Sequence, residues 1–92
     1  MAKIFKYEHE GREFRAFVKR NCYDKDLIII DIEEYHPERK IMKWIQLKKS
    51  AFFLKDYETI EDGIKAMTTI AILKEKMEQE REKKWQEFCK SC

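Results

Sequence analysis

The sequence contains little glycine and proline, with two residues of the first and one of the second among 92. Disordered linkers and low-complexity segments are usually rich in these residues, so the composition predicts one continuous folded unit. A chain of this length buries only about 60–65% of its unfolded surface and supports a single core. We therefore expect residues 1–92 to form one domain.

Long apolar runs are also absent. The longest spans residues 27–30, whereas a membrane-spanning helix needs roughly 18–20 apolar residues. The first residues lack the apolar segment and cleavage pattern of a signal peptide. The three cysteines, Cys22, Cys89 and Cys92, are an odd number and do not form a disulfide framework. These features predict a cytoplasmic protein without a membrane partner, because thiols stay reduced in that compartment.

Residue types that often carry catalysis are scarce. The two histidines, His9 and His36, fall at expected turns, and the chain has no glycine-rich phosphate loop. Cys89 and Cys92 form a C-x-x-C pair, but this pair offers two ligands where structural zinc needs four. The sequence therefore predicts a protein that is not an enzyme and that uses no metal or other cofactor.

Charge is abundant but nearly balanced, with 41% charged residues and a net charge of +2. Residues 1–55 carry 13 basic against 9 acidic side chains, and residues 56–92 carry 7 against 9. The isoelectric point of 8.4 lies below the value of about 9 that is typical of strong nucleic-acid binders. Charge alone thus permits binding of nucleic acid without indicating it.

Residues 3–9 and 12–20 alternate between apolar and polar side chains, which is the pattern of half-buried strands. Gly11 between them supplies the positive φ of a tight turn, so these segments predict a hairpin. The outer face of the second strand would carry Arg15, Phe17 and Lys19.

Residues 27–35 predict a central strand that places Ile28, Ile30 and Ile32 on one face. After a turn at Pro37, residues 40–47 predict a fourth strand. The core side of this fourth strand would carry Ile41, Ile45 and Leu47. Residues 50–55 have neither period clearly and fit a fifth strand or the start of a helix.

Residues 59–88 predict one long helix. Thr59 and Asp62 resemble a capping box, and apolar residues follow at helical spacing. The expected fold is therefore α+β, with an antiparallel sheet over residues 3–47, of four strands or five, followed by a C-terminal helix.

Such a helix would extend beyond the sheet, because about 30 residues span about 45 Å and four strands span only about 15–20 Å. The extension carries Met77, Trp85 and Phe88 among charged residues. These apolar side chains predict contact with a second copy in a homodimer, or else a break near residues 79–81 that folds the helix back.

Cations and aromatic rings also gather on the expected strands and turns. Single-stranded nucleic acids are bound by combining cations for phosphates with rings on which bases stack. The candidate binding residues are Lys6, Arg15, Phe17, Lys19, Tyr23, Lys40 and Lys43. The other interpretation places rings such as Phe17 and Tyr35 in the core or in a dimer contact.

The segment Ile-Asp-Ile-Glu-Glu-Tyr at residues 30–35 precedes a proline-containing turn, the sequence Lys-Trp-Ile-Gln-Leu at residues 43–47, and a helix. In this order of features the chain resembles the single-stranded-DNA-binding transcriptional coactivators of the positive cofactor four family, over roughly residues 12–67. The resemblance implies a four-stranded sheet, a helix that builds a twofold dimer, and a role in transcription regulation. It also implies phosphate contacts from Arg15, Lys19 and Lys43, with Tyr23 near a stacked base.

A second hypothesis comes from the small size, high charge and lack of an active-site set. The chain would then be a small phage or mobile-element protein that binds and inhibits a host protein complex. Its charged sheet or its extended helix would form the contact.

Overall fold

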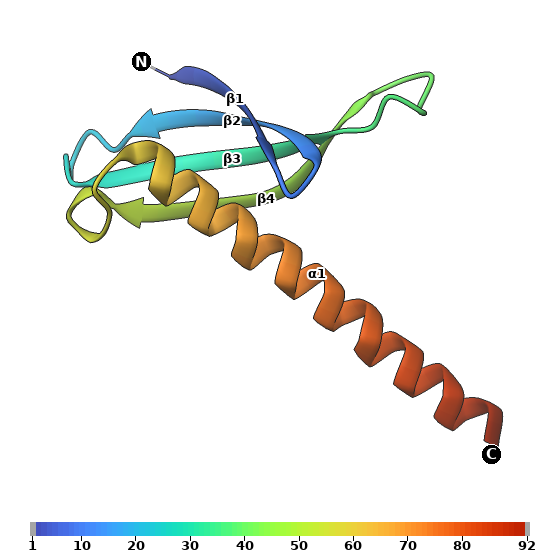
Figure 1. Ribbon diagram of the computed structural model, residues 1–92. Helices are drawn as coiled ribbons and strands as arrows, with labels where there is room; N and C mark the ends of the chain where they lie inside the picture. Colours follow the sequence, from blue (N-terminus) through green and yellow to red (C-terminus); the bar gives the residue numbers. More distant parts are fainter. Residues whose placement is uncertain (1, 92) are drawn as a thin grey trace.

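The computed structural model describes residues 2–91 as one antiparallel sheet followed by a long helix (Figure 1). The elements are β1 (Lys3–His9), β2 (Arg12–Arg20), β3 (Leu27–Tyr35), β4 (Trp44–Phe53), the 3-10 turn η1 (Leu54–Asp56) and α1 (Ile60–Ser91). Strands that are neighbours in sequence are neighbours in the sheet, in the order β1-β2-β3-β4. The predicted α+β class, with a C-terminal helix, is confirmed.

The first three strands begin and end where the alternation predicted. The turn between β1 and β2 consists of Glu10 and Gly11, with φ angles of 53° and 74°. Two residues at positive φ produce the twist that joins antiparallel strands tightly. His9 therefore pairs with Arg12, and the register continues to Lys3 opposite Val18.

The prediction for the fourth strand was wrong in position. Residues 40–43 lie in the β3–β4 loop, and β4 runs from Trp44 to Phe53. The loop is closed by a hydrogen bond from the His36 amide to the Lys43 carbonyl, at 2.6 Å. Ile41, expected in the core, is 77% exposed, because the loop carries it beyond the last residue pair of the sheet.

Residues 50–55 form neither a fifth strand nor the start of the helix. Residues 50–53 complete β4, and Leu54 begins η1. A register shift in the β3–β4 ladder beside Ile32 and Glu33 inserts an extra residue into β4. This bulge lies at Leu47, before the segment. Residues 50–53 alternate regularly, but Phe52 is buried whereas Phe53 on the opposite face is 40% exposed, so apolar residues on both faces obscured the period.

The core lies between one sheet face and the first half of α1. Its buried apolar side chains are Tyr7, Phe14, Ala16, Ile28, Ile30, Ile32, Phe52, Ile64, Ala71 and Ile72. The three isoleucines of β3 thus face the helix, as their spacing predicted. Leu47 packs against this core although it is only partly buried.

A buried hydroxyl pair connects β1 to α1. The Thr68 hydroxyl donates to the carbonyl of Ile64 at 2.8 Å, so it accepts from the Tyr7 hydroxyl at 2.6 Å. Burial raises the pKa of Tyr7, against a smaller lowering by the bond to Thr68. Both hydroxyls are therefore satisfied inside the core.

A salt bridge connects β2, β3 and α1 at the edge of the core. Arg12 forms two hydrogen bonds with Glu34, and its Nη2 lies 3.8 Å from the carboxylate of Glu75. Hydrogen bonding to Glu34 raises the pKa of Arg12 above its ordinary value. Glu34 is nearly buried, and this pairing compensates for its desolvation.

The helix begins at a cap and continues without a break. The Asp62 amide donates to the Thr59 hydroxyl at 3.1 Å, as the capping box predicted. The buried residues of α1 end at Ile72, and the following turns project beyond the sheet (Figure 1). The alternative in which residues 79–81 break the helix is therefore wrong. We call residues 77–91 the overhang.

Candidate nucleic-acid interface

The sheet has a second face that points away from α1, which we call the open face. On β2, Phe14 and Ala16 are buried under the helix, so Arg15, Phe17 and Lys19 alternate onto the open face. Lys6 on β1 reaches this face because its neighbour Tyr7 lies in the core. Four of the seven predicted binding residues therefore share one surface.

An arginine and three aromatic rings meet on the half of the open face next to the β3–β4 loop. The Arg15 guanidinium carbon lies 4.4 Å from the ring centroid of Trp44 and 5.1 Å from that of Phe17. Tyr35 contacts Trp44 with centroids 4.9 Å apart and ring planes tilted by 45°. We call Arg15, Phe17, Tyr35 and Trp44 the open-face cluster. It joins β2, β3 and β4.

Arg15 is held in place by Glu33 on the neighbouring strand. Its Nε and Nη2 atoms both lie 2.7 Å from Oε1 of Glu33. These contacts compensate most of its charge and hold the guanidinium over Trp44. Arg15 therefore positions the ring, and its predicted role as a direct phosphate contact would require its guanidinium to bind Glu33 and the phosphate at the same time.

Residues from both edge strands of the sheet border one hollow on the open face. This hollow, of about 280 Å³, is lined by Lys6, Tyr7, Glu8, Glu13 and Trp44. Trp44 belongs to β4 and Lys6 to β1, the opposite edge of the sheet. A half-buried ring and a lysine thus line the same concave surface.

The charges of the open face are balanced overall. The strand residues that alternate onto it include the cations Lys6, Arg15, Lys19 and Lys49 and the carboxylates Glu8, Glu13, Asp31 and Glu33. Within residues 2–91, neither Lys6 nor Lys19 has a carboxylate within 4.0 Å, so both ammonium groups are unpaired. Positive charge is therefore local rather than spread over a broad basic field.

Of the remaining predicted binding residues, the two lysines lie next to the open-face cluster and the tyrosine lies far from it. Tyr23 is 96% exposed in the β2–β3 connection, where its amide donates to the Asn21 side chain at 2.8 Å. Lys40 and Lys43 lie at the other end of β3, in the β3–β4 loop, and Lys43 directly precedes Trp44 of the cluster. Nine residues of strand, about 30 Å, separate the two ends.

Trp44 is the residue that sequence reasoning overlooked. It was placed within the fourth strand, directly before Ile45 on the core side, but was not included among the candidate binding residues. The pairing of Trp44 with Tyr35 at the end of the ladder fixes it on the open face. The available signal in the sequence was that two aromatic residues, Tyr35 and Trp44, flank the turn that contains Pro37.

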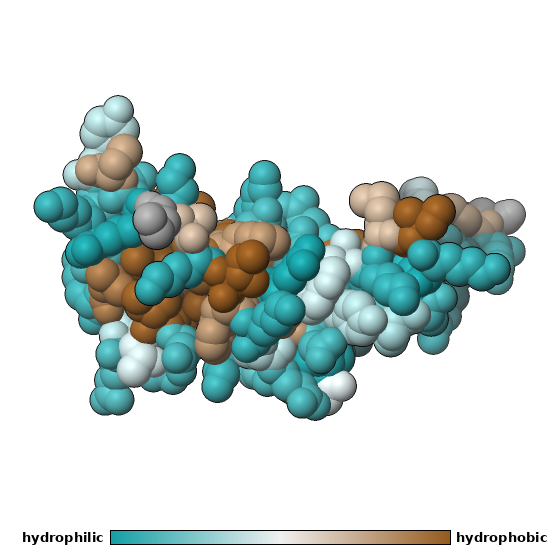
Figure 2. Space-filling view, turned by 90° about the horizontal axis from the view of Figure 1, so that it is seen from above, coloured by the Kyte–Doolittle hydropathy of each residue, from teal (hydrophilic) through white to brown (hydrophobic). Residues whose placement is uncertain are grey.

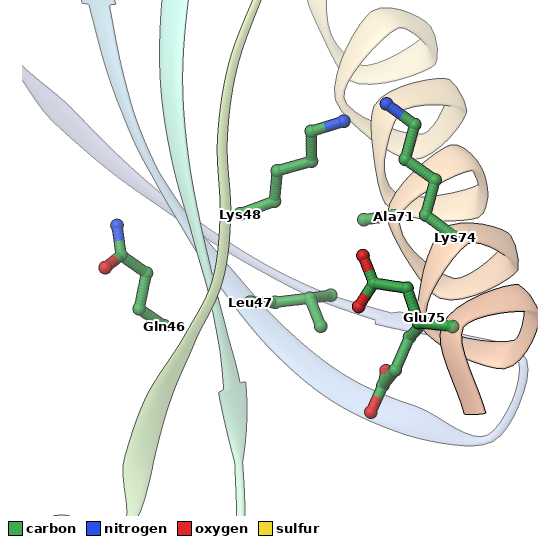
Figure 3. A pocket seen from close by; sticks show the side chains of 7 residues that line it. Gln46, Leu47, Lys48, Ala71, Lys74 and Glu75 are labelled. Atoms are coloured by element: carbon green, nitrogen blue, oxygen red, sulfur yellow. The ribbon is translucent and has the colours of Figure 1, made fainter. Parts of the chain in front are cut away.

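The helix side of the sheet carries a separate groove of about 410 Å³ between β4 and α1. Figure 3 shows Lys48 and Lys74 pointing toward one another across it, above Leu47. The ammonium group of Lys74 lowers the pKa of Lys48. Because this groove lies on the helix side of the sheet, it does not belong to the candidate interface.

The apolar residues predicted for a partner contact are exposed on the overhang. Met77 is 51% exposed, and Trp85 and Phe88 are each 60% exposed. The two aromatic rings stack on each other with centroids 5.8 Å apart. Figure 2 shows apolar atoms gathered at the C-terminal end of the molecule, separated from those over the sheet by hydrophilic residues.

Comparison of the chain with protein-family models, curated proteins and solved structures finds no match. Among the residues described here, no helix is both long and apolar enough to cross a membrane. Residues 2–91 also contain no group of three or more histidine, cysteine or acidic side chains arranged to hold a metal ion.

Proposed function

We propose that this chain is a non-enzymatic binding module that holds single-stranded DNA or RNA on its open face and acts as a homodimer. A link to transcription follows from the resemblance to the positive cofactor four family alone. The observation that carries the proposal is the open-face cluster, in which rings from three strands lie beside unpaired lysines.

The geometry of the open face suits an extended strand. Bases stack on exposed aromatic faces, and each stack contributes about 1–3 kcal/mol with little dependence on sequence. Phe17, Tyr35 and Trp44 supply half-buried rings on this face, and Arg15 fixes the orientation of Trp44. Lys6 and Lys19 are free to contact phosphates.

The balanced charge of the open face predicts moderate affinity. Each phosphate neutralised by a lysine releases counterions, so the affinity falls with salt in proportion to the number of such contacts. With Lys6 and Lys19 as the main contacts, we expect a shallow but measurable salt dependence. A duplex buries its base faces, so we expect it to bind more weakly than a single strand.

The direct test uses Trp44 as its own reporter. In a Trp85→Phe background Trp44 is the only tryptophan, and a bound single strand of thymidines should quench its fluorescence. Trp44→Ala, followed by fluorescence anisotropy of a labelled strand, should weaken binding about 5- to 150-fold. Lys19→Glu and Lys6→Glu should each weaken binding and flatten the salt dependence.

Lys65→Glu is a matched control, because it makes the same charge change at an exposed position of α1. It should leave the affinity nearly unchanged. Lys43→Glu tests whether the β3–β4 loop also contacts the strand. Binding that ignores salt, or that survives Trp44→Ala, would exclude the open face as the site.

The second candidate is a protein partner, with the chain acting as a phage-type inhibitor of a host complex. The equal number of cations and carboxylates on the open face favours it, since protein surfaces offer both signs. Copurification of one stoichiometric host protein, lost on Trp44→Ala and kept on Lys65→Glu, would favour this candidate over nucleic acid.

A further inference from the structure

One continuous row of side chains runs along α1 on the side away from the sheet. We call it the α1 stripe, and it consists of Ile70, Leu73, Met77, Arg81, Trp85 and Phe88. Its five apolar members are 40–60% exposed. Ile70 is exposed whereas Ile72, two residues further along the helix, is buried. Two residues correspond to about 200° of rotation, so the stripe faces away from the core.

The spacing of the stripe matches an unbroken, straight helix. Its members are separated by three or four residues, on average 3.6. This equals the number of residues per turn, so the row stays on one side of α1 over its whole length. From Ile70 to Phe88 the stripe extends about 27 Å. Arg81, the only polar member, can lay its aliphatic stem along the row.

The middle of the stripe already has the shape of a helix-packing site. A hollow of about 390 Å³ is lined by Lys74, Met77, Glu78 and Arg81. Residues at this i, i+3, i+4, i+7 spacing form the hole that receives a side chain from a facing helix. The hollow is centred on Met77, a flexible side chain that adapts well to such a hole.

The charged side chains around this hollow can pair with the same side chains of a second copy that is related by a twofold axis. Lys74 and Arg81 lie one turn before and after Glu78 on the same side of Met77. If a second helix runs antiparallel and crosses at Met77, its Glu78 comes beside Lys74 and Arg81 of the first, and the reverse also holds. A parallel arrangement brings identical residues level with each other and loses this pairing.

We infer that the α1 stripe binds a second copy of this chain, with two α1 helices antiparallel and Met77 at the twofold axis. Each Met77 enters the hollow of the other copy. Trp85 of one copy then lies level with Thr69 and beside Ile70 of the other, Phe88 lies level with Ala66, and Arg81 lies level with Leu73. This inference specifies, and rests on, the homodimer part of the proposed function. It does not depend on binding of nucleic acid.

The arrangement leaves the open faces accessible. The stripe lies on the side of α1 away from the sheet, and the open face is the far surface of that sheet. The twofold axis places the two sheets at opposite ends of the helix pair. The dimer would therefore present two separate open faces to one long ligand.

Cysteine cross-linking of the full chain tests the register. With Cys22, Cys89 and Cys92 changed to serine, Met77→Cys should give a disulfide-linked dimer on mild oxidation, because the two positions meet at the axis. Arg81→Cys is the matched control on the same stripe. Antiparallel pairing separates its two copies by about 12 Å along the helices, too far for a disulfide.

Light scattering of the unmodified protein gives the mass independently. A dimer that cross-links through Met77→Cys and not through Arg81→Cys supports the inference. Cross-links at both positions would indicate parallel helices, and a dimer with neither would place the contact elsewhere. Both results would overturn this inference and leave the homodimer standing. A monomer at all concentrations would overturn both.

A charge exchange tests the pairing itself. Glu78→Lys should raise the dimer dissociation constant about tenfold or more, because it sets three cations beside one another. Adding Lys74→Glu exchanges the two charges in each copy and should recover most of the affinity. Circular dichroism must show the same helix content in all variants. Equal dimer affinity of Glu78→Lys and the unchanged protein would contradict the antiparallel register.

Discussion

Gly63 is a single residue whose smallness sets the distance between α1 and the sheet. A Cβ atom built at this position would lie 2.4–2.7 Å from ring atoms of Phe52. Phe52 cannot turn aside freely, because its ring is 5% exposed and meets Tyr57 edge-on with centroids 5.4 Å apart. The helix can thus approach β4 only with glycine at position 63.

Gly63→Ala should therefore destabilise the protein by about 1–3 kcal/mol through overpacking. In most helix interiors the same change stabilises by up to about 1 kcal/mol, so the sign of the effect is diagnostic. Urea unfolding measures it. In a Phe52→Leu background the penalty should shrink, and a penalty unchanged by that background would contradict the contact as its cause.

The buried phenol of Tyr7 makes the free energy of unfolding depend on pH in the alkaline range. Its raised pKa means that the folded protein keeps the phenol proton above pH 10.0, the ordinary pKa, while the unfolded chain releases it. The contribution of this group to stability is therefore complete below about pH 10 and is lost as the pH rises through the folded-state pKa.

Tyr7→Phe should lower the free energy of unfolding by about 0.5–1.5 kcal/mol near neutral pH, because the bond to Thr68 is lost. The difference in free energy of unfolding between Tyr7→Phe and the unchanged protein should become smaller toward about pH 11. The unchanged protein loses stability there as its phenol titrates, whereas the variant has no phenol at this position. Urea unfolding at about pH 8 and about pH 11 gives both values. Tyr23→Phe, at a 96% exposed site, is the control and should leave the free energy of unfolding unchanged at both pH values.

At the scale of the elements, α1 has two parts with different roles. Residues up to Ile72 pack on the sheet, and Glu75 makes the last ion pair with it. Among the described residues, no hydrogen bond or ion pair joins residues 77–91 to the sheet. The overhang thus contributes little to the fold of one copy.

Ending the chain after Lys76 should change the free energy of unfolding by less than about 1 kcal/mol, a few degrees in Tm. The protein should still unfold cooperatively but should be monomeric by light scattering. The measurement needs low protein concentration, because association itself adds stability. A truncated chain that no longer folds would mean that the overhang supports the sheet.

The strands also differ in how far the sequence predicted them. Strict alternation and a two-residue turn fixed β1, β2 and β3 to the residue. β4 was misplaced because the long β3–β4 loop carries apolar Ile41, and because the bulge near Leu47 breaks the alternation. Local pattern therefore sufficed only where no irregularity intervened.

At the scale of the whole molecule, two surfaces carry the proposals. The open face, proposed to bind nucleic acid, and the α1 stripe, proposed to bind a second copy, lie on opposite sides of the layer in which α1 packs on the sheet. The molecule extends 53 Å along its longest axis, largely because the helix continues past the sheet. A homodimer through the α1 stripe would extend this shape further and separate the two open faces. An extended ligand suits such a dimer better than a compact one.

By itself the sequence determined that alternating residues form a sheet, that a capped helix follows, and that Arg15, Phe17 and Lys19 share one face. These follow from periods of 2 and 3.6, which are local properties. Only the tertiary structure decided that Trp44 meets Arg15 and Tyr35, and that Lys6 borders the same hollow. The reason is physical: these contacts depend on strand register and on the twist of the sheet, which no local period specifies.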